Sequence, residues 1–451
     1  MKKRLLYPCL LAGLVAYVGF GATLYHVHAA DDKDDAYTQL EVFTRVLERV
    51  RKDYVDGDKI SYKDLIQSAL KGMLGSLDPH SEYMDISKYT ELKEDTGGTY
   101  GGVGLQVNVR DNQLIVIAPM EDTPAFEAGI LNGDQIVKIE GKPTDRMNMN
   151  DAIKKLRGET GTKVTITIAR PSLPEPKDIV LTRREIRMFS VKDVNNRREF
   201  PIGEDKIGYV RLTQFGERTS DELEDALGRM EAQGMESLVM DLRGNPGGLL
   251  DQAVGVCEKF LERGQPIVST EGRNRLADVQ RLASGRGRVR AKLPLILLVN
   301  GGSASASEIV SGCLQDLKRA VVVGETTFGK GSVQNILPLS DGTALRLTTA
   351  KYYTPSHKVI HEHGITPDIV VTTSDDEEVA IQLRRIPGGK ANLDEALKLY
   401  PADRQIHLKE LVDEEIDPQY DRARDLLKGV QMFSKRQQDK PANSKAAPAL
   451  N

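Results

Sequence analysis

The stretch Leu295–Leu339 reads LILLVNGGSASASEIVSGCLQDLKRAVVVGETTFGKGSVQNILPL. Two short apolar runs within it, Leu295–Val299 and Ala320–Val323, have the length and composition of buried strands, and a segment with helical spacing separates them. A turn with three serines follows the first run, and a glycine-flanked lysine, Lys330, follows the second. A strand–helix–strand unit places both segments at the same edge of one sheet. A serine nucleophile and a lysine base would be neighbours at that edge.

The neighbouring segments continue the alternation of strands and helices. Strand patterns at Lys206–Leu212 and Ser237–Asp241 alternate with helical patterns at Ser220–Gln233, Leu249–Arg263 and Ser305–Leu317. This order predicts an α/β core with a largely parallel sheet covered by helices.

The start of the chain differs from its middle. A basic segment, Lys2–Arg4, precedes an uncharged run, Leu5–Tyr25, and the small residues Ala29 and Ala30. This pattern predicts a secretory signal peptide cleaved near Ala29 or Ala30. The run of about 20 residues is also long enough to span a bilayer, so an uncleaved anchor is the alternative. Either way, the bulk of the chain is expected outside the cytoplasm, in the periplasm or cell envelope.

Charge and cysteine content narrow the function only slightly. The formal net charge of −4 gives no electrostatic reason to expect nucleic-acid binding, which normally needs a basic face. Cys9 follows Pro8 in the signal region, which argues against a lipoprotein anchor. Cys257 and Cys313 lie in helical patterns, and two buried free thiols are expected rather than a disulfide.

A separate unit of short strands and glycine turns precedes the core. Its order of elements resembles a PDZ domain, with the carboxylate-binding loop at Gly102, Val103, Gly104 and Leu105. Successive N–H groups of such a loop bind a C-terminal carboxylate, and the neighbouring strand edge accepts the peptide as an added strand. The expected elements after the loop are a strand at Leu114–Ala118, a helix at Pro124–Ile130, a strand at Gly133–Ile139, a helix at Asn150–Arg157 and a strand at Lys163–Ala169.

The segment Gly324–Lys330 nearly matches a nucleotide-binding P-loop. It fits G-x-x-x-x-G-K, but the motif needs Ser or Thr directly after the lysine and a helix that begins there. Gly331 occupies that position, and Val333–Leu337 has a strand pattern instead. The sequence therefore does not predict an NTPase.

Lys330 can act as a base only if its amine is neutral. A solvated lysine has a pKa near 10.4, so burial must lower the pKa by about 3–4 units for activity at neutral pH. Phe328 and Val333 are expected to supply apolar walls around it. Acidic neighbours would raise the pKa of the lysine and are expected to point away. These neighbours are Glu308, Asp316 and Glu325.

The spacing of Ser303, Ser305 and Ser307 does not by itself select a nucleophile. Ser305 and Glu308 fit a capping box, in which the serine caps the helix and the glutamate reaches back. A nucleophile at a helix start would also gain backbone N–H groups that stabilise an oxyanion. Capping and catalysis both remain open on this pattern, and no G-x-S-x-G motif or recognisable histidine triad competes with it.

Four features together resemble the carboxy-terminal-processing (tail-specific) proteases: SASASE at 303–308, GETTFGKGSVQ at 324–334, DLRGNPGG at 241–248 and the upstream PDZ unit. The similarity covers roughly Leu40–Ile369. The resemblance implies an exported serine endopeptidase with a Ser/Lys dyad, in which Ser305 is the nucleophile, Lys330 the base and Gln334 the residue that orients the amine.

The same resemblance implies an oxyanion hole and a regulatory PDZ domain. The oxyanion donors are expected to be the N–H of Ala306 and that of Gly247 or Gly248, which the sequence does not separate. The PDZ domain is expected to bind the substrate C-terminus and to gate activity. Arg157 fits a position that signals ligand occupancy, although an ordinary solvated arginine at a helix end is an equal alternative.

No cofactor is expected. His361 and His363 are spaced like zinc ligands on a strand but lack a clear third ligand, so His357, His361 and His363 are interpreted as part of a surface strand. The expected partners are protein substrates with exposed C-termini, an adaptor protein and further copies of the chain. A non-catalytic PDZ scaffold or chaperone for C-termini is the alternative function.

The predicted fold class is multidomain α/β. Its parts are a signal peptide or anchor (1–30), a helical N-terminal region (31–95), a PDZ domain (96–171), an α/β serine protease core (172–375), a helical C-terminal region (376–434) and a disordered tail (435–451).

Overall fold

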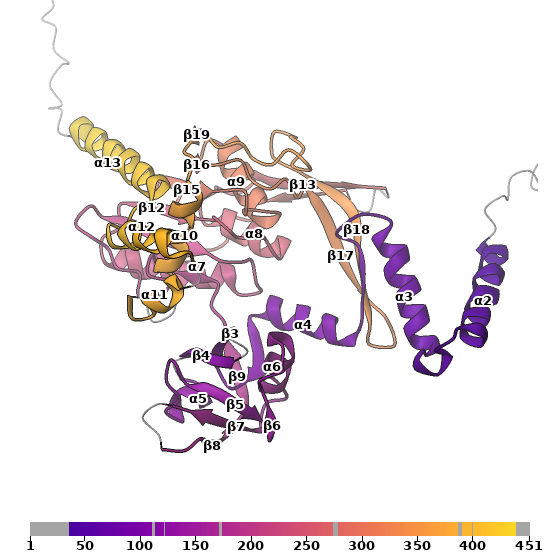
Figure 1. Cartoon of the computed structure of the whole chain (residues 1–451). Coiled ribbons are helices and arrows are strands. Elements are labelled where there is room, and N and C mark those ends of the chain that lie inside the picture. The colour runs from indigo at the N-terminus through magenta and orange to yellow at the C-terminus, as the bar shows by residue number, and fades with distance from the viewer. Residues whose placement is uncertain are drawn as a thin grey trace, which may run out of the picture. The chain divides into compact units, whose positions relative to one another are not determined.

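The computed structural model describes residues 36–110, 113–120, 122–170, 174–273, 278–386, 390–398 and 400–438 (Figure 1). The predicted signal peptide or anchor, residues 1–30, lies outside these ranges, as does the predicted tail beyond residue 438. Within these ranges, no helix is long and apolar enough to cross a membrane. The chain divides into two compact units, Met1–Tyr83 and Met84–Asn451.

The described part of the first unit is helical up to Gly75, within the region 31–95 predicted to be helical, and it ends in the first residues of β1. It contains α2 (Ala36–Asp53), the short 3-10 helix η1 (Gly57–Lys59) and α3 (Tyr62–Gly75). Ser61 begins α3 with a capping box: its hydroxyl accepts from the Asp64 amide at 3.1 Å, and the Asp64 carboxylate accepts from the Ser61 amide at 3.3 Å. These bonds satisfy amides that a helix start would otherwise leave unpaired.

The second unit includes α4 (Ile86–Gly97) and then the predicted PDZ domain. An antiparallel sheet runs in the order β3-β4-β5-β7-β8, with β6 beside β5, and its apolar side chains form a core of their own with those of two helices. The bounds are β3 (Leu105–Arg110), β4 (Gln113–Pro119), α5 (Pro124–Glu127), β5 (Gln135–Ile139), β6 (Lys142–Pro143), α6 (Met149–Leu156), β7 (Lys163–Ala169) and β8 (Lys177–Thr182).

The PDZ sheet extends beyond its predicted limit at residue 171. β7 ends before this limit and β8 begins after it, and the two strands pair antiparallel, with Ile166 opposite Ile179. The next strand, β9 (Arg184–Arg187), pairs with β2 (Thr99–Gly102). The prolines near residue 171 therefore interrupt the strand pattern between two paired strands rather than between two domains.

The α/β core is built on a sheet in the order β10-β11-β12-β15-β16-β19. Within it, β11, β12, β15, β16 and β19 pair parallel with their neighbours, and β10 pairs antiparallel with β11. This confirms the expected largely parallel sheet. The bounds are β10 (Val191–Lys192), β11 (Ile207–Leu212), α7 (Thr219–Ala232), β12 (Ser237–Asp241), α8 (Leu250–Glu258), β15 (Leu295–Val299), α9 (Ala306–Asp316), β16 (Val321–Gly324) and β19 (Ile369–Val370). α8 ends at Glu258, earlier than predicted.

Each face of this sheet has its own apolar core. Alternate strand residues pack with α7, α8 and α9 on one face. On the other face, Tyr209, Val239 and Leu298 pack against Ala423 and Leu427 of the C-terminal helix α13. Burial on both faces explains why these strands read as continuous apolar runs. Cys257 and Cys313 are buried and free in the first core, as predicted.

A second, antiparallel sheet contains β13, β14, β17 and β18, and β17 begins directly after the lysine-bearing loop. A helical C-terminal region follows the core, as predicted, but its last helix continues to Gln438, beyond the predicted start of the tail at residue 435. The bounds are β1 (Glu82–Met84), β13 (Pro266–Gly272), β14 (Val279–Leu282), β17 (Ser332–Pro338), β18 (Ala344–Tyr353), α10 (Asp375–Arg384), α11 (Lys390–Leu397), α12 (Ala402–Asp413) and α13 (Pro418–Gln438).

Candidate active site

The serine turn and the lysine loop leave the same edge of the core sheet, as predicted. β15 and β16 are parallel neighbours, with Leu298 opposite Val323. Ser305 lies between β15 and α9, and Lys330 lies between β16 and β17. Because both segments follow the carboxyl ends of adjacent parallel strands, they lie side by side.

Ser305 has a strained backbone. Its φ is 54° and its ψ is −110°, and the residue is 8% exposed. A positive φ is uncommon for a residue other than glycine and costs on the order of 1–3 kcal/mol, so the surroundings must impose it. Strain of this kind concentrates at functional sites, which distinguishes Ser305 from an ordinary helix cap.

The two flanking serines bind the loop 241–248, which carries the DLRGNPGG motif. The Ser303 hydroxyl donates to the Leu242 carbonyl at 2.8 Å, and the Ser307 hydroxyl donates to the Asn245 carbonyl at 2.9 Å. The Asn245 carbonyl also accepts from the Ala304 amide at 3.0 Å. Ser303 and Ser307 therefore have structural partners, a distinction that their equal spacing in the sequence does not reveal.

Gly247 approaches the serine turn too closely for any other residue. It has a φ of 102°, and a Cβ there would lie 2.8 Å from the Cβ of Ser305 and 3.0 Å from the amide nitrogen of Ala306. Its own amide donates to Asn245 Oδ1 at 2.9 Å. In the described part of the chain, the amides of Ala306 and Gly248 have no hydrogen-bond acceptor. Both amides are therefore available to an acceptor from outside the described part of the chain.

The Glu308 carboxylate joins the serine turn to the lysine loop. Its Oε2 accepts from the amides of Ser305 and Lys330, both at 2.8 Å. Its Oε1 accepts from the Thr327 hydroxyl and from the Gly329 amide, both at 2.6 Å. The side chain is fully buried. Glu308 provides its half of the predicted capping box and also fixes the loop that carries the lysine.

The expectation that Glu308 points away from Lys330 is wrong. Burial lowers the pKa of Lys330, and the Arg346 cation lowers it further, whereas Glu308 opposes the shift. The net direction is still toward a neutral amine, because desolvation disfavours the charged form. The other two acidic side chains have partners elsewhere: Asp316 binds Ser356 and Lys358, and Glu325 binds the Thr373 amide.

The surroundings of Lys330 differ from the prediction in other respects. The Phe328 side chain is 64% exposed and provides no buried wall, whereas Val333 packs against the core. The turn at 361–364 packs on the loop so tightly that a Cβ at Gly331 would lie 2.2 Å from the His361 amide nitrogen. His361 and His363 lie in this turn, and the His357 amide closes another by donating to the Thr354 carbonyl at 2.8 Å, so none of the three is on a strand. The described residues contain no cluster suited to a metal ion.

The predicted pair Ser305 and Lys330 lies on neighbouring loops, after β15 and β16. In the described ranges, no hydrogen bond joins the Ser305 hydroxyl to the Lys330 amine. The Gln334 amide, predicted to orient that amine, instead donates to the Ser332 hydroxyl at 2.7 Å. The serine turn and the lysine loop thus lie at one edge of the sheet without a hydrogen bond between these two side chains in the described ranges.

A groove in the PDZ domain matches the predicted peptide site. A cavity of about 250 Å³ is lined by Val103, Gly104 and Leu105, together with Leu156 and Arg157 of the helix opposite. Apolar walls beside a glycine loop suit a C-terminal apolar residue. Gly102 does not line this cavity; the Tyr100 ring lies where its Cβ would be, at 2.8 Å.

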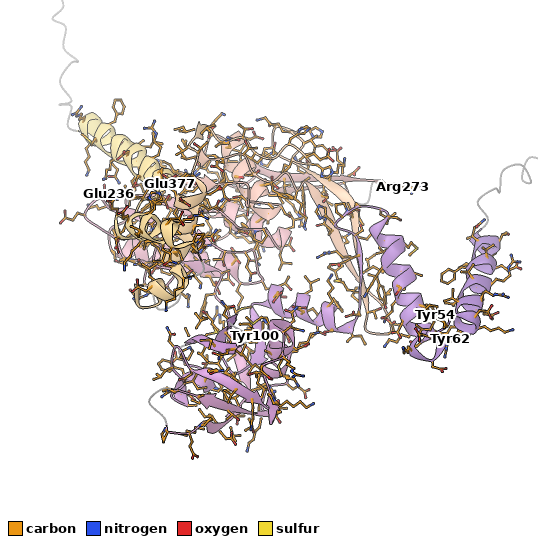
Figure 2. The ribbon with its side chains drawn as sticks, in the orientation of Figure 1. Tyr54, Tyr62, Tyr100, Glu236, Arg273 and Glu377 are labelled. Atoms are coloured by element: carbon orange, nitrogen blue, oxygen red, sulfur yellow. The ribbon has the colours of Figure 1, made fainter. Side chains whose placement is uncertain are left out.

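Arg157 has specific partners. Its guanidinium lies 3.3 Å from the Glu94 carboxylate of α4 and 4.4 Å from the ring centroid of Tyr100, the β2 residue labelled in Figure 2. Ion pairing and cation–π contact both hold the side chain at the rim of the groove. These contacts argue against an ordinary solvated arginine.

Sequence reasoning missed Asn245 and Asn300, which hold the site together, and the bonds of Glu308 to the lysine loop. Asn300 Oδ1 accepts from the Gly244 amide at 2.9 Å and from the Gly302 amide at 3.1 Å. The only sequence signals were the position of Asn245 inside a glycine-rich motif and the capping pattern of Glu308.

Comparisons with known proteins identify two families in this chain. The model of "Peptidase family S41" matches residues 206–371, and that of "PDZ domain" matches residues 115–170. A carboxy-terminal-processing protease of Bartonella bacilliformis is 46% identical over 348 residues, which is 76% of this chain and 77% of the relative. A carboxyl-terminal-processing protease of Synechocystis is 39% identical over 67% of this chain and 70% of the relative.

Among solved structures, the photosystem II D1 C-terminal processing protease is 30% identical, with a TM-score of 0.41. The match covers 73% of this chain and 92% of that one.

Proposed function

The chain belongs to the carboxy-terminal-processing serine proteases of peptidase family S41, and we propose that it cleaves exported proteins near their C-termini with a Ser305/Lys330 dyad. The strained backbone of Ser305 carries this proposal. The flanking serines donate to backbone carbonyls, so Ser305 is the member of the three left for chemistry. Lys330, whose pKa burial lowers, follows the adjacent strand.

The proposed reaction uses four groups. Ser305 Oγ attacks the scissile carbonyl while neutral Lys330 takes its proton and later gives it to the leaving amine. The amides of Ala306 and Gly248 donate to the oxyanion that forms. Gly248 is favoured over Gly247 because the Gly247 amide already donates to Asn245 Oδ1 at 2.9 Å. Gly247 instead provides the close approach to the serine turn.

We propose that the PDZ domain binds the substrate C-terminus and that occupancy completes the site. A series of contacts supports this coupling: Arg157 pairs with Glu94, and the next two residues of α4 contact the core. The Asp95 carbonyl accepts from Gln214 at 3.3 Å, and the Thr96 carbonyl accepts from Glu217 at 2.8 Å.

Gln214 and Glu217 lie on either side of Phe215 and Gly216, and Phe215 contacts the loop that carries Gly248. The Phe215 amide donates to the Gly247 carbonyl at 2.9 Å, and the Phe215 carbonyl accepts from Leu249 at 2.8 Å. A shift of α4 on ligand binding would therefore reach both sides of Gly248. Engagement also requires Lys330 to approach Ser305, with Gln334 leaving Ser332 to orient the amine.

The pH dependence of cleavage tests the lysine base. Because the neutral amine is the active form, kcat/KM should rise with pH through the lowered pKa of Lys330. The rate should level off below the ordinary lysine value. The measurement is initial rates on a fluorogenic peptide with an apolar C-terminus, from roughly pH 5 to pH 11. A rate that rises only as an exposed lysine titrates, near pH ~10, would contradict a desolvated base.

Replacing Arg157 with Ala tests the gating. Stimulation of cleavage by an added C-terminal peptide should fall at least about fivefold, the lower range of allosteric coupling. Peptide binding, measured by fluorescence anisotropy, should weaken less. Lys154→Ala, an exposed lysine on the same helix, is the matched control and should keep the wild-type stimulation. Equal stimulation in both variants would show that Arg157 does not couple peptide binding to cleavage.

The substrates proposed are exported proteins with flexible, partly apolar C-termini, caught by strand addition at the PDZ groove. Export is proposed on the signal pattern in residues 1–30. An adaptor protein and a homo-oligomer are proposed partners, and size-exclusion chromatography with light scattering would test self-association.

A further inference from the structure

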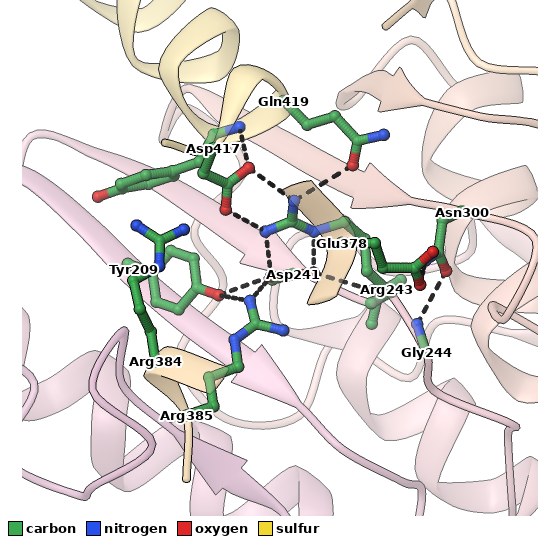
Figure 3. Close-up of polar contacts among 12 residues, drawn as sticks. Tyr209, Asp241, Arg243, Gly244, Asn300, Glu378, Arg384, Arg385, Asp417 and Gln419 are labelled. Atoms are coloured by element: carbon green, nitrogen blue, oxygen red, sulfur yellow. Dashed lines mark hydrogen bonds and ion pairs between the residues drawn. The ribbon is translucent and has the colours of Figure 1, made fainter. Parts of the chain in front are cut away.

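A buried ionic cluster contains Asp241 and Arg243, the first and third residues of the DLRGNPGG motif (Figure 3). At its centre the Arg243 guanidinium makes two-pronged contacts with two carboxylates. It donates to Asp241 at 3.0 and 2.7 Å, and to Asp417 at 2.8 and 2.9 Å. A further bond of 3.2 Å goes to Gln419 Oε1. Arg243 is only 6% exposed, so these partners hold its charge away from water.

The cluster extends to a second arginine and a tyrosine. Asp241 Oδ2 also accepts from Tyr209 at 2.6 Å and from Arg385 at 2.8 Å. Two guanidinium groups against one carboxylate hold the pKa of Asp241 well below its usual range. Arg385 follows α10, whereas Asp417 and Gln419 lie at the start of α13. The C-terminal region therefore supplies most of the partners.

Arg243 belongs to the same short loop as the oxyanion amide. Gly244 follows it and donates to Asn300 Oδ1, which also accepts from Gly302 of the serine turn. Asn245 then fixes Gly247 through the 2.9 Å bond to its amide. A displacement of Arg243 would thus pass directly to the position of Gly248.

Stability alone is a weak reason for this cluster. Buried ion pairs often contribute no more to stability than apolar residues of the same size, but they define one geometry. An arginine held by two carboxylates in two-pronged contacts has little freedom to rotate or shift. The cluster is therefore suited to hold the loop where hydrogen-bond donors must be placed accurately.

We propose that Asp417 is a positioning residue for catalysis, which fixes Arg243 and through it the oxyanion amide of Gly248. The inference rests on the oxyanion role proposed for that amide. If Asp417 has this role, the start of α13 contributes to the active site although it is 174 residues from Arg243 in the sequence.

The test compares two contacts that α13 makes with the protease core: Asp417 with Arg243 and Arg424 with Asp205. Asp417→Asn weakens the tether to the oxyanion loop. Arg424→Gln, the matched control, removes a contact between α13 and Asp205, of 2.7 Å, that does not involve this loop. Both full-length variants are assayed for kcat and KM on one fluorogenic peptide, for inhibition by a peptide aldehyde that forms a tetrahedral adduct with serine, and for Tm.

Asp417→Asn should lower kcat about 100-fold, the effect of a misplaced catalytic group, while KM stays within about twofold. The aldehyde should bind correspondingly more weakly, because its adduct needs the same oxyanion donors. Arg424→Gln should keep kcat and aldehyde affinity within about threefold even if its Tm falls.

The proposal is overturned if Asp417→Asn keeps kcat within about threefold of wild type, or if both variants lose kcat equally. Should the Asn variant not fold, Asp417→Glu decides: it keeps the charge but shifts the carboxylate by one methylene. A kcat loss of about tenfold at unchanged KM supports the proposal, and wild-type kcat overturns it. Failure of the dyad would show separately, as continued cleavage by Ser305→Ala.

Discussion

Replacing Ser305 with Ala, or Lys330 with Ala, is expected to reduce cleavage of an unfolded protein with an apolar C-terminus by at least about 10⁴-fold. The first change removes the nucleophile and the second removes the base that activates it. Because the two act as a unit, the double variant should be no slower than either single one. The measurement is the appearance of fragments in the presence of excess enzyme, followed by mass spectrometry.

The same variants separate a protease from a non-catalytic scaffold for C-termini. Both functions require peptide binding, so fluorescence anisotropy with a C-terminal peptide should give unchanged affinity in each variant. Ser340→Ala and Lys351→Ala, exposed residues of the same two types outside the serine turn and the lysine loop, are the controls and should keep wild-type rates. Wild-type turnover in either dyad variant would refute the dyad assignment.

Glu308→Gln is expected to have the second largest effect. The carboxylate accepts four hydrogen bonds from the serine turn and the lysine loop. An amide has one acceptor oxygen, so its NH₂ group must face donors that then lose their partners. Each unsatisfied buried donor costs about 1–3 kcal/mol, so the free energy of unfolding should fall by roughly 3 kcal/mol. Loss of the shared anchor should lower kcat at least about 100-fold.

Denaturant unfolding and steady-state kinetics on the same preparation measure both effects. Glu325→Gln is the matched control, since its carboxylate accepts from the single amide of Thr373 and a glutamine can keep that bond. A folded Glu308→Gln enzyme with kcat close to that of the control would show that the two loops do not need this link.

The arrangement of strands and helices was predictable because it depends on local apolar periodicity. The run Leu295–Val299 became β15 with the predicted limits nearly unchanged, since a parallel strand buried on both faces is apolar throughout. The positions of Ser305 and Lys330 on one edge followed from that topology. The PDZ domain was recognised from its order of elements, and the short strand β6 and the last strand β8 were missed.

The contacts that organise the site could not be predicted, because they join segments far apart in the sequence. Arg243 and Asp417 are 174 residues apart, and the periodicity of neither segment indicates that these two residues bind each other. The spacing of the three serines does not distinguish one from another, whereas the bonds of Ser303 and Ser307 to backbone carbonyls set these two apart from Ser305. Phe328 was expected to be buried from its apolar character alone, but the residue is 64% exposed.

The packing of α13 against the core sheet has a practical consequence for dissecting this enzyme. The matched protease region ends at residue 371, which invites the expression of a minimal catalytic fragment. Such a fragment would uncover the apolar sheet face that Ala423 and Leu427 bury, and it would leave Arg243 without Asp417. The smallest piece that can be expected to fold and react is therefore set by tertiary contacts rather than by sequence similarity, and it extends to the end of α13.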